Sequence, residues 1–195
     1  MTANEVLAAV MLRLNLDGNA NVQATDYQTR QLVGFMNEAG ADIARRVEWS
    51  RLYRSAETDG GKIWALPEDF DRMAEAGAVM RKPDGAFYRI VTSPTLWAWL
   101  MANPSAQPYC QIAEGTLMLR PDPEDGIVVR YLSREWAGNG PRITSGDVDL
   151  AIPGRLLASG TVYRALRQKG FPYDDVLAEH EADLLDDAKA DRGAA

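Results

Sequence analysis

The longest amphipathic segment of the chain runs from Asp26 to Ser50 and constrains the rest of the fold. Thr25 and Gln28 have the spacing of a capping box, and Asp26 adds an acidic group where the helix dipole favours one. The apolar residues recur at steps that place them on one stripe of an α-helix: Leu32, Phe35, Met36, Ala39, Ile43 and Val47. A helix of this length spans about 40 Å, so the segment is predicted to be the central element of a helical core.

Three more segments have helical periodicity. They are Ala3–Leu14, Pro153–Lys169 and Asp174–Arg192. Thr2 and Glu5 repeat the capping-box spacing before the first of them. In the second, Gly160 allows a close contact with another helix, and Gly170 stands where a helix commonly ends. The sequence therefore predicts helices at both ends of the chain.

The middle of the chain, from Leu52 to Leu132, has short apolar runs punctuated by glycine and proline, which is typical of a small antiparallel sheet. Three turn signals, Asp59–Gly61, Lys82–Gly85 and Glu114–Gly115, each separate two runs and predict hairpins. The runs are residues 52–57, 62–66, 76–80, 87–91, 109–113 and 116–119, with a further strand at 127–132. A helical turn is expected at Pro67–Asp71 and a short helix from Ser93 to Met101.

These elements predict an α+β fold, in which a bundle of about four helices carries an inserted antiparallel β-rich module. The bundle would comprise residues 1–51 and 150–195, and the insert residues 52–135. Between them lies a polar, glycine-containing loop at residues 136–149. Long connections tend to be functional or to become ordered on a partner, so this loop is expected to lie at an interface.

Composition excludes several classes of protein. Among 195 residues there is one cysteine, Cys110, and one histidine, His180, so neither an internal disulfide nor a Cys/His metal site is expected, and no cofactor motif is found. The net charge of −7 disfavours tight nucleic-acid binding by the whole surface. No run has the length of a membrane span, which takes about 18 apolar residues. We expect a protein made in a cytoplasm, with no membrane partner.

The candidates for catalysis are weak, and no enzyme is expected. Glu68, Asp69 and Asp71 could pair carboxylates for glycoside hydrolysis or hold a cation, but a solvated turn after Pro67 explains them as well. His180 faces the apolar stripe of its helix, which is typical of a packed histidine. A cell-wall-degrading enzyme that uses the three carboxylates remains the alternative from this class.

Other residues are candidates for contacts with partners. Trp97 and Trp99 are two apart on a short helix and cannot easily point the same way, so one is expected to be exposed, and Trp136 begins the polar loop. Four arginines cluster in sequence and could form a DNA-binding patch, a salt bridge between subunits or a solvated face: Arg45, Arg46, Arg51 and Arg54. Asp174 and Asp175 are read as a helix start.

The order of several motifs resembles that of one known family. The motifs are NEAGADIARRVEWSRL, LPEDFDR, YLSREW, LAIPGRLLASGTVYRALRQKGFPYDD and a final acidic helix. In this order and within this length, the chain resembles the head-to-tail connector, or adaptor, proteins of tailed bacteriophages and gene-transfer particles, and it is most similar to the ring adaptors of short-tailed phages. The resemblance covers nearly the whole chain, although none of the motifs is a catalytic signature.

The resemblance implies a structural virion protein. It implies a ring of about twelve copies in the neck, below the portal protein and above a downstream tail or nozzle protein. It also implies a central channel through which the genomic DNA passes without specific binding, for which an acidic surface is suitable. The region that follows Asp174 is implied to reach the portal, which makes Asp174 and Asp175 interface candidates.

Overall fold

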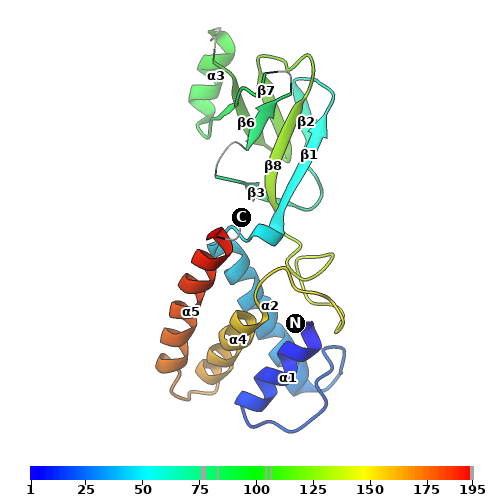
Figure 1. The fold of residues 1–195 in the computed structure, drawn as a ribbon, viewed down its shortest axis with the longest axis vertical. Coiled ribbons are helices and arrows are strands. Elements are labelled where there is room, and N and C mark those ends of the chain that lie inside the picture. Colours follow the sequence, from blue (N-terminus) through cyan, green and yellow to red (C-terminus); the bar gives the residue numbers. More distant parts are fainter. Residues whose placement is uncertain (76–77, 83, 104, 106, 194–195) are drawn as a thin grey trace. The chain divides into compact units, whose positions relative to one another are not determined.

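The computed structural model divides into two compact units, which we call the helical unit and the β unit. The helical unit comprises Met1–Leu52 and Arg134–Ala195, and the β unit comprises Tyr53–Ser133 (Figure 1). The structure describes residues 1–75, 78–82, 84–103, 105 and 107–193. The combination of helices with sheets confirms the predicted α+β class.

The helical unit is built around helix α4, Gly154–Gln168. The three other helices of this unit all contact α4, namely α1 at Ala3–Arg13, α2 at Tyr27–Arg46 and α5 at Asp174–Gly193. Most of α4 is buried as a result, including Leu156, Leu157 and Thr161. A Cβ on Gly160 would lie only 3.2 Å from Cβ of Ala39 in α2, so the predicted close helix contact at this glycine is confirmed. No described helix has the length and hydrophobicity to cross a membrane.

The ends of α1 and α2 are fixed by local hydrogen bonds. The capping box at Thr2 and Glu5 is present as predicted. For α2, the prediction that Thr25 caps the helix is wrong, because Asp26 accepts the Thr29 backbone N–H at 2.8 Å and occupies the capping position. This hydrogen bond also lowers the pKa of the Asp26 carboxyl. At its other end α2 stops at Arg46, before the predicted Ser50.

The polar connection after Arg134 is anchored to the helical unit by apolar side chains. Trp136, Ile143 and Leu150 are all buried. The backbone N–H of Ile143 donates to Oδ1 of Asn37 at 2.7 Å. A short bridge pairs Ala137 with Leu150 and closes the loop. The chain itself therefore supplies contacts that hold this segment, which the sequence analysis expected to lie at an interface.

The described residues of the β unit form two four-stranded sheets. One contains β1 at Tyr53–Thr58, β3 at Phe70–Met73, β4 at Val79–Arg81 and β8 at Ile127–Ser133. The other has the order β2, β7, β6, β5, with bounds Ile63–Ala65, Thr116–Arg120, Tyr109–Ala113 and Arg89–Ile90. In the first sheet β8 is central, because β1, β3 and β4 all pair with it.

The predicted hairpin across Asp59–Gly61 does not form. Strand β1 pairs with β8, from Tyr53 opposite Leu132 to Thr58 opposite Ile127, and β2 pairs with β7 in the other sheet. Positive φ angles at Gly60 and Gly61 let the chain pass from one sheet to the other. The β6–β7 hairpin is present as predicted, but the pairing of β5 with β6 is parallel, so the expectation of a purely antiparallel module is wrong there.

Two other predictions in this region have mixed outcomes. A bridge between Met80 and Phe87 joins the runs on either side of Lys82–Gly85, but the predicted start of that strand at Ala76, and Pro83 in the turn, lie outside the described residues. The predicted helical turn at Pro67–Asp71 is a short turn, and strand β3 already begins at Phe70.

The inner faces of the two sheets form the core of the β unit. This core includes Val79, Cys110, Leu117, Leu119, Ile127 and Val129. Burial raises the pKa of the Cys110 thiol to about 12, which makes it an inert packing group. Helix α3, Pro94–Ala102, begins at the predicted Ser93 cap and has a separate small core. There Trp97 and Leu100 pack with Val91, and with the partly buried Tyr109 and Met118.

Candidate interaction surfaces

A network of charged side chains connects three helices of the helical unit. Arg46 of α2 makes a two-pronged salt bridge with Glu181 of α5, in which one hydrogen bond is 2.7 Å long. Asp42 lies 3.9 Å from Arg46 and 3.3 Å from Arg164 of α4. Arg164 also donates to the Gly160 carbonyl at 2.9 Å. The hydrogen bonds from Arg46 lower the pKa of Glu181, so this pair stays charged at neutral pH.

His180 lies beneath this network and is fully buried. Its Nδ1 is 2.9 Å from Oγ of Ser159, whose hydroxyl donates to the Leu156 carbonyl. The imidazole N–H is therefore on Nδ1 and donates to Ser159. The ring also packs on Tyr163, with 5.4 Å between centroids. Nε2 has no hydrogen-bond partner in the part of the chain that the structure describes, which suits a neutral packed histidine and leaves no acceptor for a second proton.

We expect the burial of His180 to make the helical unit less stable in acid. Desolvation lowers its pKa below 6.5, with Arg164 and Arg46 acting in the same direction and Glu181 and Asp42 opposing them. The stabilisation by the neutral ring is complete above about pH 6.5 and is lost as pH falls through the lowered pKa, with a slope of at most about 1.4 kcal/mol per pH unit. His180→Phe should remove this contribution.

The measurement is the free energy of opening of α4 and α5, from hydrogen exchange between about pH 7 and pH 5. The difference between His180→Phe and the unmodified chain isolates the imidazole, because the carboxylates titrate in both proteins. Parallel pH profiles of the two proteins would show that the ring does not titrate with folding.

The four clustered arginines do not act as one basic patch. Arg46 is bound to Glu181, and Arg51 donates to the Leu150 carbonyl at 2.7 Å and to Asp149 at 2.5 Å. Arg54 lies on β1 in the other unit and donates to the Tyr53 carbonyl at 2.9 Å. Arg45 is exposed. Two of the four arginines thus already pair with carboxylates of their own chain. Because tight DNA binding requires clustered cations that neutralise phosphates, this pairing argues against a DNA-binding patch here.

The three tryptophans named as candidates for partner contacts differ in exposure. Trp97 is buried and Trp99 is 59% exposed, so the two rings on α3 point apart. Trp136 is only 2% exposed and packs over Gly40 of α2, so this ring belongs to the core of the helical unit, whereas the sequence analysis named it as a candidate for contact with a neighbouring subunit. Leu96, three residues before Trp99 on the helix, is also exposed, and these two side chains give α3 an apolar outer face. The expectation that one of the two tryptophans is exposed is confirmed, but the sequence analysis did not name Leu96, although the lack of any charged residue in α3 was a visible signal of an apolar surface.

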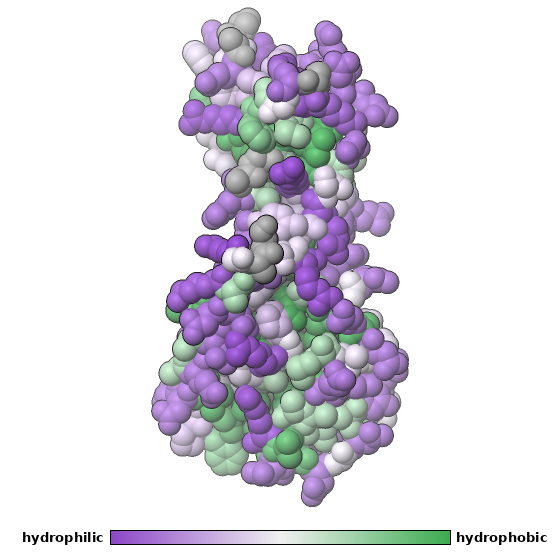
Figure 2. Space-filling model, in the orientation of Figure 1, coloured by the Kyte–Doolittle hydropathy of each residue, from purple (hydrophilic) through white to green (hydrophobic). Residues whose placement is uncertain are grey.

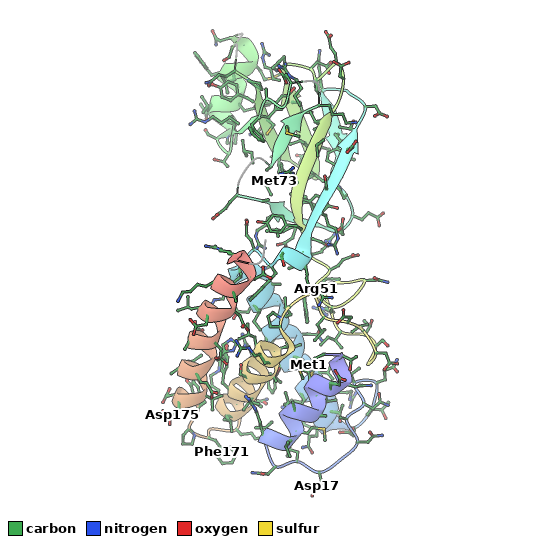
Figure 3. All side chains as sticks on the ribbon, viewed as in Figure 1. Met1, Asp17, Arg51, Met73, Phe171 and Asp175 are labelled. Atoms are coloured by element: carbon green, nitrogen blue, oxygen red, sulfur yellow. The ribbon has the colours of Figure 1, made fainter. Side chains whose placement is uncertain are left out.

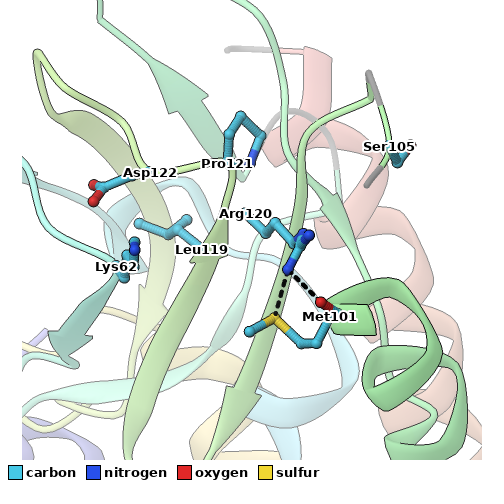
Figure 4. Close-up of a pocket in the computed structure, with 7 residues that line it drawn as sticks. All are labelled: Lys62, Met101, Ser105, Leu119, Arg120, Pro121 and Asp122. Carbon is cyan, nitrogen blue, oxygen red and sulfur yellow. Dashed lines mark hydrogen bonds between the residues drawn. The ribbon is translucent and has the colours of Figure 1, made fainter. Parts of the chain in front are cut away.

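A hollow of about 410 Å³ lies beside α3 in the β unit (Figure 4). It is lined by Lys62, Met101, Ser105, Leu119, Arg120, Pro121 and Asp122. Arg120 donates to the Met101 carbonyl at 2.7 Å and approaches the Met101 sulfur at 3.6 Å, so its charge holds the end of α3 to β7.

The acidic cluster after Pro67 has structural partners. Asp69 accepts a hydrogen bond from the Tyr131 hydroxyl at 2.8 Å, and Asp71 binds Arg72 at 2.7 Å. No group of three or more metal-ligating side chains gathers anywhere among the described residues. Asp69 therefore links the start of β3 to β8, whereas the ion pair of Asp71 lies within β3 itself.

Asp174 and Asp175 lie where α5 begins, and both are exposed. Figure 3 shows Asp175 and Phe171 at one end of the helical unit and Arg51 at the other. Hydrophilic side chains cover much of the face shown in Figure 2, with smaller apolar areas between them. These surfaces are suited to bind other macromolecules, through the apolar face of α3 in the β unit and through the charged side chains at the ends of the helical unit.

Exposed apolar and charged surfaces of this kind are common in proteins that bind other macromolecules. The chain matches the family model described as SU10 adaptor protein over residues 1–195, and it belongs to this family of phage adaptor proteins. The resemblance found in the sequence motifs is thereby confirmed. A comparison with curated proteins found no match. The family makes this chain a virion-associated structural protein.

Proposed function

We propose that this protein is the head-to-tail adaptor of a tailed phage, and that about twelve copies form a ring in the neck of the virion. The observation that carries the proposal is the family match over residues 1–195. The ring binds the portal protein on one side and a downstream tail or nozzle protein on the other. It is assembled in the host cytoplasm and surrounds a channel for the genome.

Two further observations support this assignment. A ring of identical subunits requires two different surfaces on each subunit, and the chain offers an apolar face on α3 and differently charged ends of α5. The net charge of −7 suits a channel that DNA must pass without being held, since tight DNA binding depends on clustered Lys and Arg.

Deletion of the gene is expected to give filled heads without tails, because the portal would then lack the surface on which the tail assembles. Electron microscopy of lysates measures this, and the gene supplied in trans should restore tailed particles. Copies per virion, counted by quantitative mass spectrometry against the portal, should be about twelve if the ring has that symmetry. Normal tails on particles that lack the protein would refute the assignment.

A further inference from the structure

A groove with an apolar floor and a basic rim lies beside the carboxyl end of α5, with a volume of about 300 Å³. We call it the basic groove; it is lined by Arg46, Val47, Leu184, Leu185, Ala188, Lys189 and Arg192. Leu185 is 60% exposed at this groove, although it is a large apolar residue in a helix rich in charge. An exposed leucine with cations around it suits a ligand that combines an apolar group with carboxylates.

Cations on the rim of the groove are available to pair with carboxylates from outside the subunit. Arg46 is bound to Glu181, and Lys189 makes only an exposed pair with Asp186 at 3.3 Å. Exposed pairs of this kind contribute little stability and exchange readily. Arg192 is exposed and has no ion pair with any residue in the described part of the chain. At least one cation is thus free for an external carboxylate, and a second can change partner.

The opposite end of α5 has the complementary groups. We call it the acidic corner; it consists of Phe171, Asp174 and Asp175. Phe171 is 56% exposed, and both aspartates are exposed with no ion pair in the described part of the chain. Figure 3 shows Phe171 and Asp175 together at this end of the unit.

The acidic corner has a defined backbone. Gly170 has a φ of 71°, and Phe171 N–H donates to the Leu166 carbonyl at 3.0 Å, which ends α4 in a Schellman-type turn. The turn positions Phe171 before α5 begins at Asp174. A rigid corner loses little conformational entropy when it binds, so its exposed aromatic ring is suited to be an anchor.

We propose that the acidic corner of one copy binds the basic groove of the next copy in the ring. Phe171 would pack on Leu185 and Ala188, while Asp174 and Asp175 would pair with Lys189 and Arg192 of the neighbour. The occupant is a second copy because the chain carries both complementary surfaces. This inference rests on the proposed ring and specifies its lateral contact.

The geometry forces the contact to be between subunits. The acidic corner lies at the start of α5 and the groove near its other end, and the helix from Asp174 to Ala188 separates them by about 21 Å. The two surfaces therefore cannot meet within one chain, and each contact moves the next copy along the direction of α5. About twelve repeats of about 21 Å give a circumference of about 250 Å and a diameter of about 80 Å at this level. Helix α5 would run around the ring and not along its axis.

Engineered cysteines test the contact in assembled virions. The only native cysteine, Cys110, is buried, so new thiols can be placed without interference. In a chain with Asp175→Cys and Lys189→Cys the two thiols lie about 20 Å apart within one subunit, far beyond the reach of a disulfide. Oxidation of purified particles should give a ladder of cross-linked multimers, whereas each single variant should give none. Asp17→Cys combined with Lys189→Cys is the control. Asp17 is exposed at the same end of the helical unit as Asp175, but it is not part of the acidic corner.

The outcomes separate the contact from the ring. A ladder from the first pair that is absent from the control pair supports the proposal. No ladder in particles that contain about twelve copies would overturn this contact and leave the ring intact. Cross-links to the portal or to a tail protein instead of a second copy would also overturn it. A single copy per virion would overturn the ring itself.

Charge reversal provides a second test with a different readout. Lys189→Glu with Arg192→Glu, or Asp174→Lys with Asp175→Lys, should each reduce incorporation into virions at least about tenfold through like-charge repulsion at every contact. The two reversals combined in one chain should restore incorporation, because the pairing is then inverted at each contact. Circular dichroism checks that each variant is folded. Normal incorporation of the single reversals, or failure of the combination to restore it, would contradict the direct pairing.

Discussion

Gly40→Ala is expected to destabilise the helical unit by about 1–3 kcal/mol, although alanine normally favours a helix by about 1 kcal/mol over glycine. A Cβ at this position would lie 2.1 Å from Cη2 of Trp136. The indole cannot move aside because it is 2% exposed. Gly34→Ala is the matched control in the same helix, since nothing lies within 4 Å of its added Cβ, and it should be stabilising.

Trp136→Ala should have a larger effect, about 3–5 kcal/mol, since it removes the largest side chain that anchors the polar connection. In that background the sign of the Gly40→Ala effect should reverse, because the methyl group enters the space that the indole vacated. Hydrogen exchange of the α2 amides gives the free energy of opening in all four proteins. Equal effects of Gly40→Ala with and without Trp136 would show that the two residues are not in contact.

Gly126→Ala is expected to destabilise the β unit by more than about 3 kcal/mol. Gly126 has a φ of 85°, and an added Cβ would lie 1.9 Å from the Thr58 carbonyl oxygen. The clash is with backbone, so it can be relieved only by separating the ends of β1 and β8, where Thr58 and Ile127 pair.

The control for this variant is Gly115→Ala in the β6–β7 turn. Gly115 also has a positive φ, 73°, but nothing lies within 4 Å of an added Cβ. Only the conformational cost of about 1–2 kcal/mol applies there. Hydrogen exchange of β8 reports the effect of both variants. If the two substitutions lower the free energy of unfolding by the same amount, the close approach of the Thr58 carbonyl to Gly126 contributes nothing to the destabilisation.

The helices could be predicted because their signals are local. Capping residues, an apolar period and a terminating glycine all lie within a few positions of each other, and they place α1, α3, α4 and α5 within a few residues of their observed bounds. The capping error at Thr25 has a local cause as well, because Asp26 offers the same chemistry one residue later. The β6–β7 hairpin was predictable for the same reason, since Glu114 and Gly115 supply its turn.

The pairing of strands could not be predicted in the same way. The glycines after β1 indicate a change of direction, but they do not say whether the next strand returns to β1 or enters another sheet. That choice depends on β8, which follows β1 by some seventy residues and provides partners for three strands. The interface candidates share this limit. For Arg46 and Arg51 the sequence left a DNA-binding patch, a salt bridge between subunits and a solvated face open, because their partners Glu181 and Asp149 are distant in the chain.

The sequence by itself determined the α+β class, the amphipathic helices, the membership of an adaptor family and the lack of a recognisable catalytic motif, because each depends on residue types at fixed spacings. The tertiary structure alone decided which of the interface candidates named from the sequence lie on the surface. It buried Trp136 against Gly40, left Trp99 exposed, and placed a basic groove and an acidic corner at opposite ends of α5. Burial and charge pairing are set by residues far apart in sequence, and only folding brings these together.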